Sequence, residues 1–135
     1  MRVVADTNIL VSALLFGGLP AAFLDLAFAG TFQLVTSPTL LDELDEKLRL
    51  KFGLSPHDAD RIRLRLESSA DVVSTTPTLS VIKNDPDDDR VLECATVGRA
   101  NTIVSGDRHL LNLTSYEEIS IVTVRHFMDR LNPSI

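Results

Sequence analysis

The feature that most constrains this 135-residue chain is the alternation of short apolar runs with segments of helical pattern. Strands separated by helices favour an α/β fold with a parallel sheet, because each helix carries the chain back before the next strand begins. We therefore predict one α/β domain over residues 1–135, with three α/β/α layers and a mainly parallel central sheet. The expected strands are Val3–Ala5, Phe32–Thr36, Asp71–Ser74, Thr102–Val104 and Ile119–Val124, and the expected helices span about 9–16, 20–29, 37–52, 55–68, 90–100 and 125–131, with a helical turn after residue 107.

Charge and cysteine content exclude several classes of function. The formal net charge is −6, which argues against a broad basic face for duplex DNA. Cys94 is the single cysteine, so neither an internal disulfide nor a Cys-based zinc site can form. No apolar run approaches the roughly 20 residues that span a bilayer. We expect a cytoplasmic protein without a membrane partner.

Three acids from distant parts of the chain lie where strands end or helices begin. Asp6 follows the first strand, Asp107 follows Thr102–Val104, and Asp89 ends the acidic segment KNDPDDD. Each could serve only as a helix cap or a turn residue. Sites in open parallel sheets form beyond the carboxyl ends of the strands, so we favour a shared site.

The helix expected over residues 37–52 adds further carboxylates. Its apolar stripe consists of Leu41, Leu44 and Leu48, and Glu43 and Asp45 lie on the two borders of that stripe. Either side chain could reach inward. Helical periodicity alone does not choose between them.

Clustered acids need protons or a cation. Two like charges about 4 Å apart repel by about 4 kcal/mol at an effective dielectric constant near 20. Carboxylates without cysteine or histidine partners suit Mg²⁺ or Mn²⁺, which activate water and stabilise charge on phosphate esters. An EF-hand does not fit, because Arg90 replaces its glycine and Thr96 its bidentate glutamate. The three histidines lack metal-site spacing.

Four segments together resemble the PIN-domain nucleases, in particular the VapC-like toxin components of prokaryotic toxin–antitoxin modules. They are VVADTNILVSAL, SPTLLDEL, DPDDDRVLECA and TIVSGDRHLL, which occur in the family's order within residues 1–113. The resemblance implies a site of four catalytic, metal-binding acids: Asp6, Glu43, Asp89 and Asp107. It selects Glu43 over Asp45. A slip of the alignment would move the third acid to Asp87 or Asp88.

The resemblance also implies supporting residues. Asn8 and Ser105 would orient the acids, and Glu93, one helical turn beyond Asp89, could assist them. Near the acidic segments, Arg90, Arg99 and Arg108 are candidates for binding RNA phosphates.

The implied activity is Mg²⁺- or Mn²⁺-dependent hydrolysis of RNA phosphodiesters with one or two ions and no covalent nucleophile. The implied partners are an RNA substrate, a cognate antitoxin and a second copy of the chain in a homodimer. Two alternatives share the resemblance. The first is a nuclease of RNA processing or DNA cleavage outside a toxin module. The second is a catalytically silent RNA-binding module.

Overall fold

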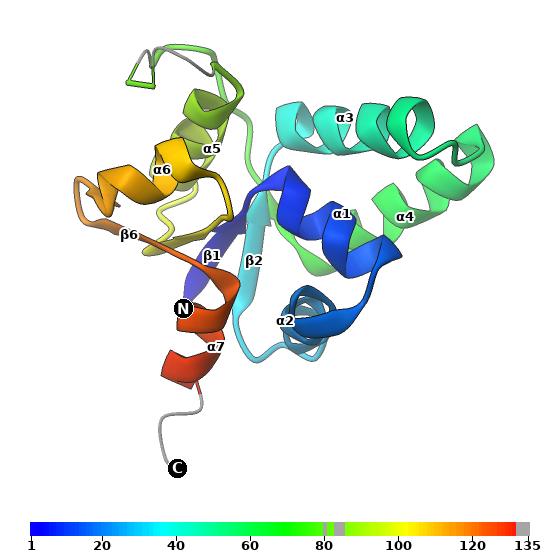
Figure 1. Cartoon of the computed structure of the whole chain (residues 1–135). Helices are drawn as coiled ribbons and strands as arrows, with labels where there is room; N and C mark the ends of the chain where they lie inside the picture. Colours follow the sequence, from blue (N-terminus) through cyan, green and yellow to red (C-terminus); the bar gives the residue numbers. More distant parts are fainter. Residues whose placement is uncertain (80, 83–85, 132–135) are drawn as a thin grey trace.

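The computed structural model describes residues 1–79, 81–82 and 86–131 (Figure 1). Helices and strands alternate through this part of the chain. The order is β1 (Arg2–Ala5), α1 (Thr7–Leu15), α2 (Gly18–Phe28), β2 (Gln33–Thr36), α3 (Pro38–Glu46), the π-helical segment η1 (Lys47–Lys51), α4 (Pro56–Ser69), β3 (Asp71–Val72), α5 (Pro86–Val97), β4 (Thr102–Val104), α6 (Arg108–Leu113), β5 (Ser115–Tyr116), β6 (Ile119–Val122) and α7 (Val124–Leu131).

The strands form one sheet with the order β3-β2-β1-β4-β6-β5. Every neighbouring pair is parallel except β5 and β6. β1 lies between β2 and β4, so the carboxyl ends of these three strands meet at one edge. The predicted α/β class and mainly parallel sheet are confirmed.

Two apolar cores lie on the two faces of the sheet. Val3 and Ala5 face a core shared with α1, α2, α3, α4 and α7, whereas Val4 faces a core shared with α5 and α6. Adjacent strand residues point to opposite faces, which explains why β1 is apolar throughout. Figure 1 shows α5 and α6 on one side of the strands and α1–α4 on the other, as a three-layer architecture requires.

α5 packs unusually close to the sheet. A Cβ atom at Gly98 would lie 2.4 Å from Cγ1 of Val35 in β2, so only glycine fits there. This close approach holds α5, whose first turn carries Asp87, Asp88 and Asp89, against the sheet.

Several boundaries differ from the sequence prediction. The helix expected to continue to Phe52 changes to π-helical geometry at Lys47, and β5 was not predicted. β5 is only two residues long, too short for an alternating pattern. α5 begins at Pro86, earlier than expected, because proline suits the first helical position.

Among the described residues, no single helix is long and apolar enough to cross a membrane. α1 and α2 reach that length only together, and a bend of 99° separates them.

Candidate metal centre at the carboxyl edge of the sheet

Asp6 and Asp107 meet at the ends of the two central strands, and Ser105 connects them. The Ser105 hydroxyl donates to Oδ2 of Asp6 at 2.9 Å and accepts from the backbone N–H of Asp107 at 2.9 Å. The backbone N–H of Asp6 donates to the Val104 carbonyl at 2.9 Å, which extends the β1–β4 pairing to the site. Asp6 is the N-cap residue of α1, and its carboxyl group contacts Ser105 as well as the Asn8 backbone, so capping alone does not account for it.

Glu43 reaches the same edge from α3. Its Oε2 accepts from the Thr7 hydroxyl at 2.9 Å, and its Oε1 lies 3.6 Å from the Lys47 ammonium. Asp45, the alternative left open by periodicity, instead binds Arg49 at 2.9 Å. Glu43 therefore joins the acid cluster, and Asp45 belongs to an ion pair within its own helix.

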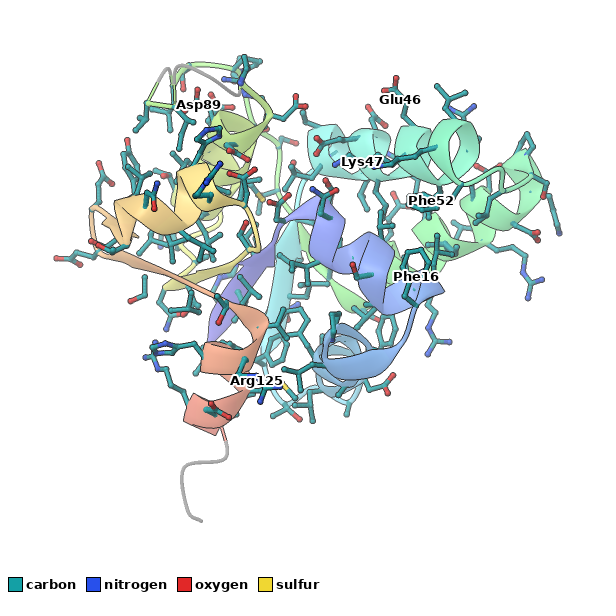
Figure 2. The ribbon with its side chains drawn as sticks, viewed as in Figure 1. Phe16, Glu46, Lys47, Phe52, Asp89 and Arg125 are labelled. Atoms are coloured by element: carbon teal, nitrogen blue, oxygen red, sulfur yellow. The ribbon has the colours of Figure 1, made fainter. Side chains whose placement is uncertain are left out.

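Lys47 brings a positive charge to the cluster. Its Nζ donates to the Thr7 hydroxyl at 2.8 Å and to Oδ1 of Asn8 at 3.0 Å. Figure 2 shows Lys47 extending towards the start of α1, while Glu46 points away from the fold. Asn8 thus contacts Lys47 through its side chain and Asp6 through its backbone.

The third acid beside this edge is Asp88. Ligand atoms of Asp88, Asp107 and His109 all lie within 4.8 Å of one another, and Asp88 hydrogen-bonds Asp107. Asp107 also accepts from the backbone N–H groups of His109 and Leu110, so it caps α6 while facing Asp88. Asp88 is buried and Asp107 is partly exposed, which leaves the group open to solvent on one side.

Asp89, the acid expected from the sequence, faces another part of the molecule. Its Oδ1 accepts from the backbone N–H groups of Val81 and Ile82, both at 2.9 Å. The residue is labelled at the start of α5 in Figure 2. The difference from the prediction is one helical position, which turns the side chain by about 100°.

Glu93 and Arg90 lie with Asp89 and not with the acid cluster. Glu93 is 3% exposed and accepts from the backbone N–H groups of Thr78 and Leu79 at 2.6 and 2.8 Å. Arg90 pairs with Glu93 at 2.8 Å and donates to the Leu79 carbonyl. Both side chains bind the segment before α5. This placement does not match the role expected for Glu93, which was to assist the metal-binding acids, or the role expected for Arg90, which was to bind an RNA phosphate.

The other two candidate phosphate ligands occupy different surroundings. Arg99 lies in the turn between α5 and β4, at the amino edge of the sheet, and lines a cavity with Glu117 and Glu118. Arg108 is exposed at the first position of α6, next to Asp107. Only Arg108 of the three lies beside the acid cluster with its charge directed to solvent.

Burial and mutual repulsion perturb the acids of this edge. Burial raises the pKa of Asp6, which Ser105 and Lys47 partly oppose and Asp107 reinforces. Burial also raises the pKa of Glu43, with Lys47 and Thr7 opposing and Asp87 and Asp6 adding repulsion. For Asp107, burial acts in the same direction, but the hydrogen bonds from Asp88 and from backbone N–H groups hold its pKa below the ordinary value.

These contacts suit a divalent cation. Two carboxyl groups at hydrogen-bond distance can both be ionised only if a cation offsets their repulsion. The donor set consists of carboxylate oxygens with one exposed imidazole, and hard divalent ions such as Mg²⁺ and Mn²⁺ bind oxygen. Among the described residues, Asp88, Asp107 and His109 form the group that could hold such an ion. Asp6, joined to Asp107 through Ser105, and Glu43 lie beside this group.

Thr7 and Lys47 contribute to the site although sequence reasoning did not select them. Thr7 is fully buried beneath Glu43, and Lys47 had only the pattern of a solvent-facing helix residue. The DTN segment contains Thr7, so its position next to Asp6 was the available signal. A long lysine side chain that reaches back to another helix leaves no signal in periodicity.

Comparisons with known proteins agree with the fold. The crystal structure of PAE2754 from Pyrobaculum aerophilum superposes with a TM-score of 0.62 at 17% identity, covering 98% of this chain and 90% of that chain. The uncharacterized protein MJ1680 of Methanocaldococcus jannaschii is 34% identical over 121 residues, covering 84% of this chain and 75% of the relative. Residues 2–109 match the PIN domain family, and Asp6, Glu43, Asp88 and Asp107 fall within that range. The chain therefore belongs to the PIN-domain family, whose fold is that of a metal-dependent nuclease.

Proposed function

We propose that this protein is an endoribonuclease that hydrolyses RNA phosphodiester bonds with one or two Mg²⁺ or Mn²⁺ ions. The observation that carries the proposal is that Asp6 and Asp107 meet through Ser105 just beyond the carboxyl ends of β1 and β4, with Asp88 of α5 and Glu43 of α3 beside them. We assign metal binding to Asp6, Glu43, Asp88 and Asp107. Asp88 takes the place of Asp89 in this assignment, because Asp89 binds backbone N–H groups.

The protein's own residues orient the acids. Ser105 fixes one oxygen of Asp6 and leaves the other for a metal ion. Thr7 fixes Oε2 of Glu43, and the Lys47 ammonium lies beside Oε1. A divalent ion held there supplies activation of water and offsets charge on the phosphate and the leaving oxygen. Cys94 does not act as a nucleophile, because burial raises the pKa of its thiol to about 12.

RNA as the substrate and a toxin as the biological role rest on the resemblance of the four segments to VapC-like proteins. The acidic net charge of −6 fits a single strand better than duplex DNA. In this proposal the protein is cytoplasmic, acts as a homodimer and is blocked by a cognate antitoxin. A PIN nuclease of RNA processing or DNA cleavage would use the same site.

Cleavage of end-labelled single-stranded RNA with added Mn²⁺ tests the activity. Wild-type protein should cleave, EDTA should abolish cleavage, and Asp6→Asn should lower the rate by about a thousandfold, equivalent to about 4 kcal/mol. Equal cleavage by both proteins would indicate a contaminating nuclease. No cleavage by folded wild type with either metal would favour a silent binding module.

The toxin role has a separate test. Induced expression of wild type should arrest growth, whereas Asp6→Asn at the same protein level should not. Growth unaffected by an active wild-type enzyme would remove the toxin role and leave the nuclease intact.

A further inference from the structure

A groove leads away from the acid cluster along α3 and η1. It has a volume of about 300 Å³ and is lined by Glu43, Glu46, Lys47, Leu50, Lys51 and Asp87. Glu43 belongs to both the cluster and the groove, so the groove opens directly onto the proposed metal site. A molecule bound in it would continue from the reacting atoms over the surface of the helix.

Two lysines mark the inner and outer parts of this groove. Lys47 lies at the inner end, against Thr7 and Asn8. Lys51 lies four residues further along the exposed surface, near the ring of Phe52. Lys47 and Lys51 stand at the two ends of η1, so their ammonium groups can contact successive positions along one extended strand.

Leu50 gives the groove an apolar wall. Its side chain is 72% exposed and so offers apolar surface to a bound molecule. Such a surface suits the face of a sugar or base more than it suits a phosphate. The groove therefore offers separate contacts for the charged and apolar parts of a nucleotide.

The charge of the groove depends on metal. Its lining carries three carboxylates and two ammonium groups, so without metal it is net negative and repels phosphate. A divalent ion at Glu43 would offset part of this negative charge. The π-helical geometry of η1 also favours a functional role for the groove, because π-helical turns occur frequently at functional sites.

We propose that this groove binds the phosphodiester strand of single-stranded nucleic acid next to the cleaved bond, with Lys47 and Lys51 on its phosphates and Leu50 against a sugar or base. This inference rests on the proposed nuclease function and names the surface that positions its substrate. Arg90 cannot supply the same contact without leaving buried Glu93, and Arg99 lies at the opposite edge of the sheet.

The test measures binding of fluorescein-labelled single-stranded RNA, and of DNA of the same sequence, by fluorescence anisotropy. Ca²⁺ replaces Mg²⁺, and the oligonucleotide is checked to remain intact. The logarithm of the binding constant falls linearly with the logarithm of the salt concentration, and each phosphate contact on a single strand makes the slope steeper by about 0.7. Lys51→Gln should therefore make the slope shallower by about 0.7 and weaken binding several-fold.

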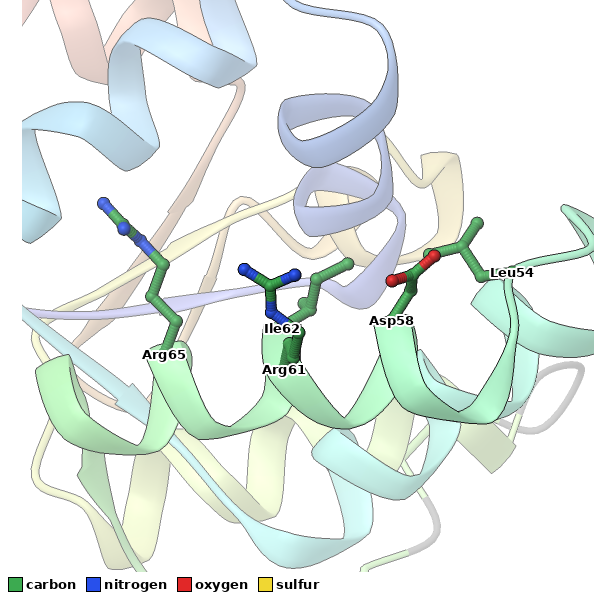
Figure 3. Close-up of a pocket in the computed structure, with 5 residues that line it drawn as sticks. All are labelled: Leu54, Asp58, Arg61, Ile62 and Arg65. Atoms are coloured by element: carbon green, nitrogen blue, oxygen red, sulfur yellow. The ribbon is translucent and has the colours of Figure 1, made fainter.

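Arg61→Gln is the matched control, because it removes one positive charge from another exposed surface. Arg61 lines a cavity of about 520 Å³ on α4 with Leu54, Asp58, Ile62 and Arg65 (Figure 3). Arg61→Gln should leave the slope of the salt dependence unchanged. An unchanged slope in Lys51→Gln, or an equal loss in Arg61→Gln, would overturn the groove assignment.

Lys47→Gln supplies a second readout that does not depend on activity. It should weaken nucleic-acid binding but tighten Mn²⁺ binding in calorimetry, because a cation next to the carboxylates is lost. Weaker Mn²⁺ binding would show that Lys47 only holds the acids in place and would overturn its phosphate role. Failure of wild type to cleave or bind would reject the function itself, whereas cleavage with an unaltered slope in Lys51→Gln rejects only the groove.

Discussion

Two sets of acids diverge from the start of α5 and have opposite kinds of partner. Asp88 faces Asp107, so one carboxyl group meets another. Asp89 and Glu93 instead meet backbone N–H groups and the Arg90 guanidinium. Asp88, Asp89 and Glu93 are all buried acids of α5, and they differ in what surrounds them.

The contrast shows that partners, and not burial or position in a motif, decide what a carboxylate does. Backbone N–H groups satisfy the buried oxygens of Asp89 and Glu93, so these acids stabilise the fold without metal. An acid that faces another acid gains stability from a cation. Asp89 and Glu93 hold the segment before α5 in place, whereas Asp88 and Asp107 belong to the group that could hold a metal ion.

The largest expected effect separates Asp88 from its neighbour. Asp88→Asn should lower Mn²⁺-dependent cleavage by about a thousandfold, because it removes a ligand. Asp89→Asn changes the same atoms one residue away and should retain cleavage within a few-fold. Initial rates on labelled RNA measure both. A large loss in Asp89→Asn and a small one in Asp88→Asn would reverse the comparison.

Glu93→Gln should unfold more easily while keeping its metal affinity. Breaking a buried ion pair costs about 3 kcal/mol, which lowers the melting temperature of a domain of this size by roughly 10 °C. Thermal denaturation followed by circular dichroism measures the first effect, and Mn²⁺ calorimetry at low temperature measures the second. Lost Mn²⁺ binding at an unaltered melting temperature would place Glu93 with the metal ligands.

Ser105→Ala tests whether orientation of the acids matters. The hydroxyl serves Asp6 and the Asp107 backbone together, so its loss should lower cleavage about tenfold, as expected for groups that orient ligands. Ser105→Thr preserves the hydroxyl and should restore most of the rate. Equal defects in both variants would point to packing of the buried residue instead.

The smallest expected effect is on the melting temperature of the metal-free protein and its dependence on pH. The folded-state pKa of Asp6 is raised, chiefly by burial, so the folded chain keeps a proton that the unfolded chain has lost. Its contribution to stability is complete below the ordinary pKa of 3.8 and is lost as pH rises through the raised value. At pH 7.5 and without metal, Asp6→Asn should therefore melt a few degrees above wild type.

The difference in melting temperature between Asp6→Asn and wild type should shrink as pH falls towards 3.8, because the Asp6 side chain then becomes neutral like that of asparagine. Melting curves in EDTA across this range provide the measurement. A wild type more stable than Asp6→Asn at pH 7.5 would mean that Lys47 and Ser105 outweigh the cost of burial.

Much of the fold followed from local patterns. Val3–Ala5 and Thr102–Val104 are apolar runs flanked by helical segments, and such runs form central parallel strands. The position of Asp6 and Asp107 beyond those strands then predicted the edge where they meet. Ser37-Pro38 predicted the start of α3, and the Ser37 hydroxyl does accept from the Leu40 backbone N–H.

The remaining features depend on contacts that periodicity does not record. Asp88 and Asp89 differ by one position, and only the docking of α5 decides which faces Asp107. Lys47 reaches Thr7 and Asn8 across a gap between helices, and η1 departs from α-helical geometry without a glycine or proline to mark it. The choice of Glu43 over Asp45 likewise came from resemblance and not from the helical wheel.

The bond between Ser105 and Asp6 joins residues 99 positions apart in the chain. On the ribosome, Asp6 emerges long before β4 exists to pair with β1. During most of synthesis the carboxylates are therefore scattered along a growing polypeptide, and the proposed metal centre cannot form. Its assembly has to wait until β4 and Asp107 have been translated.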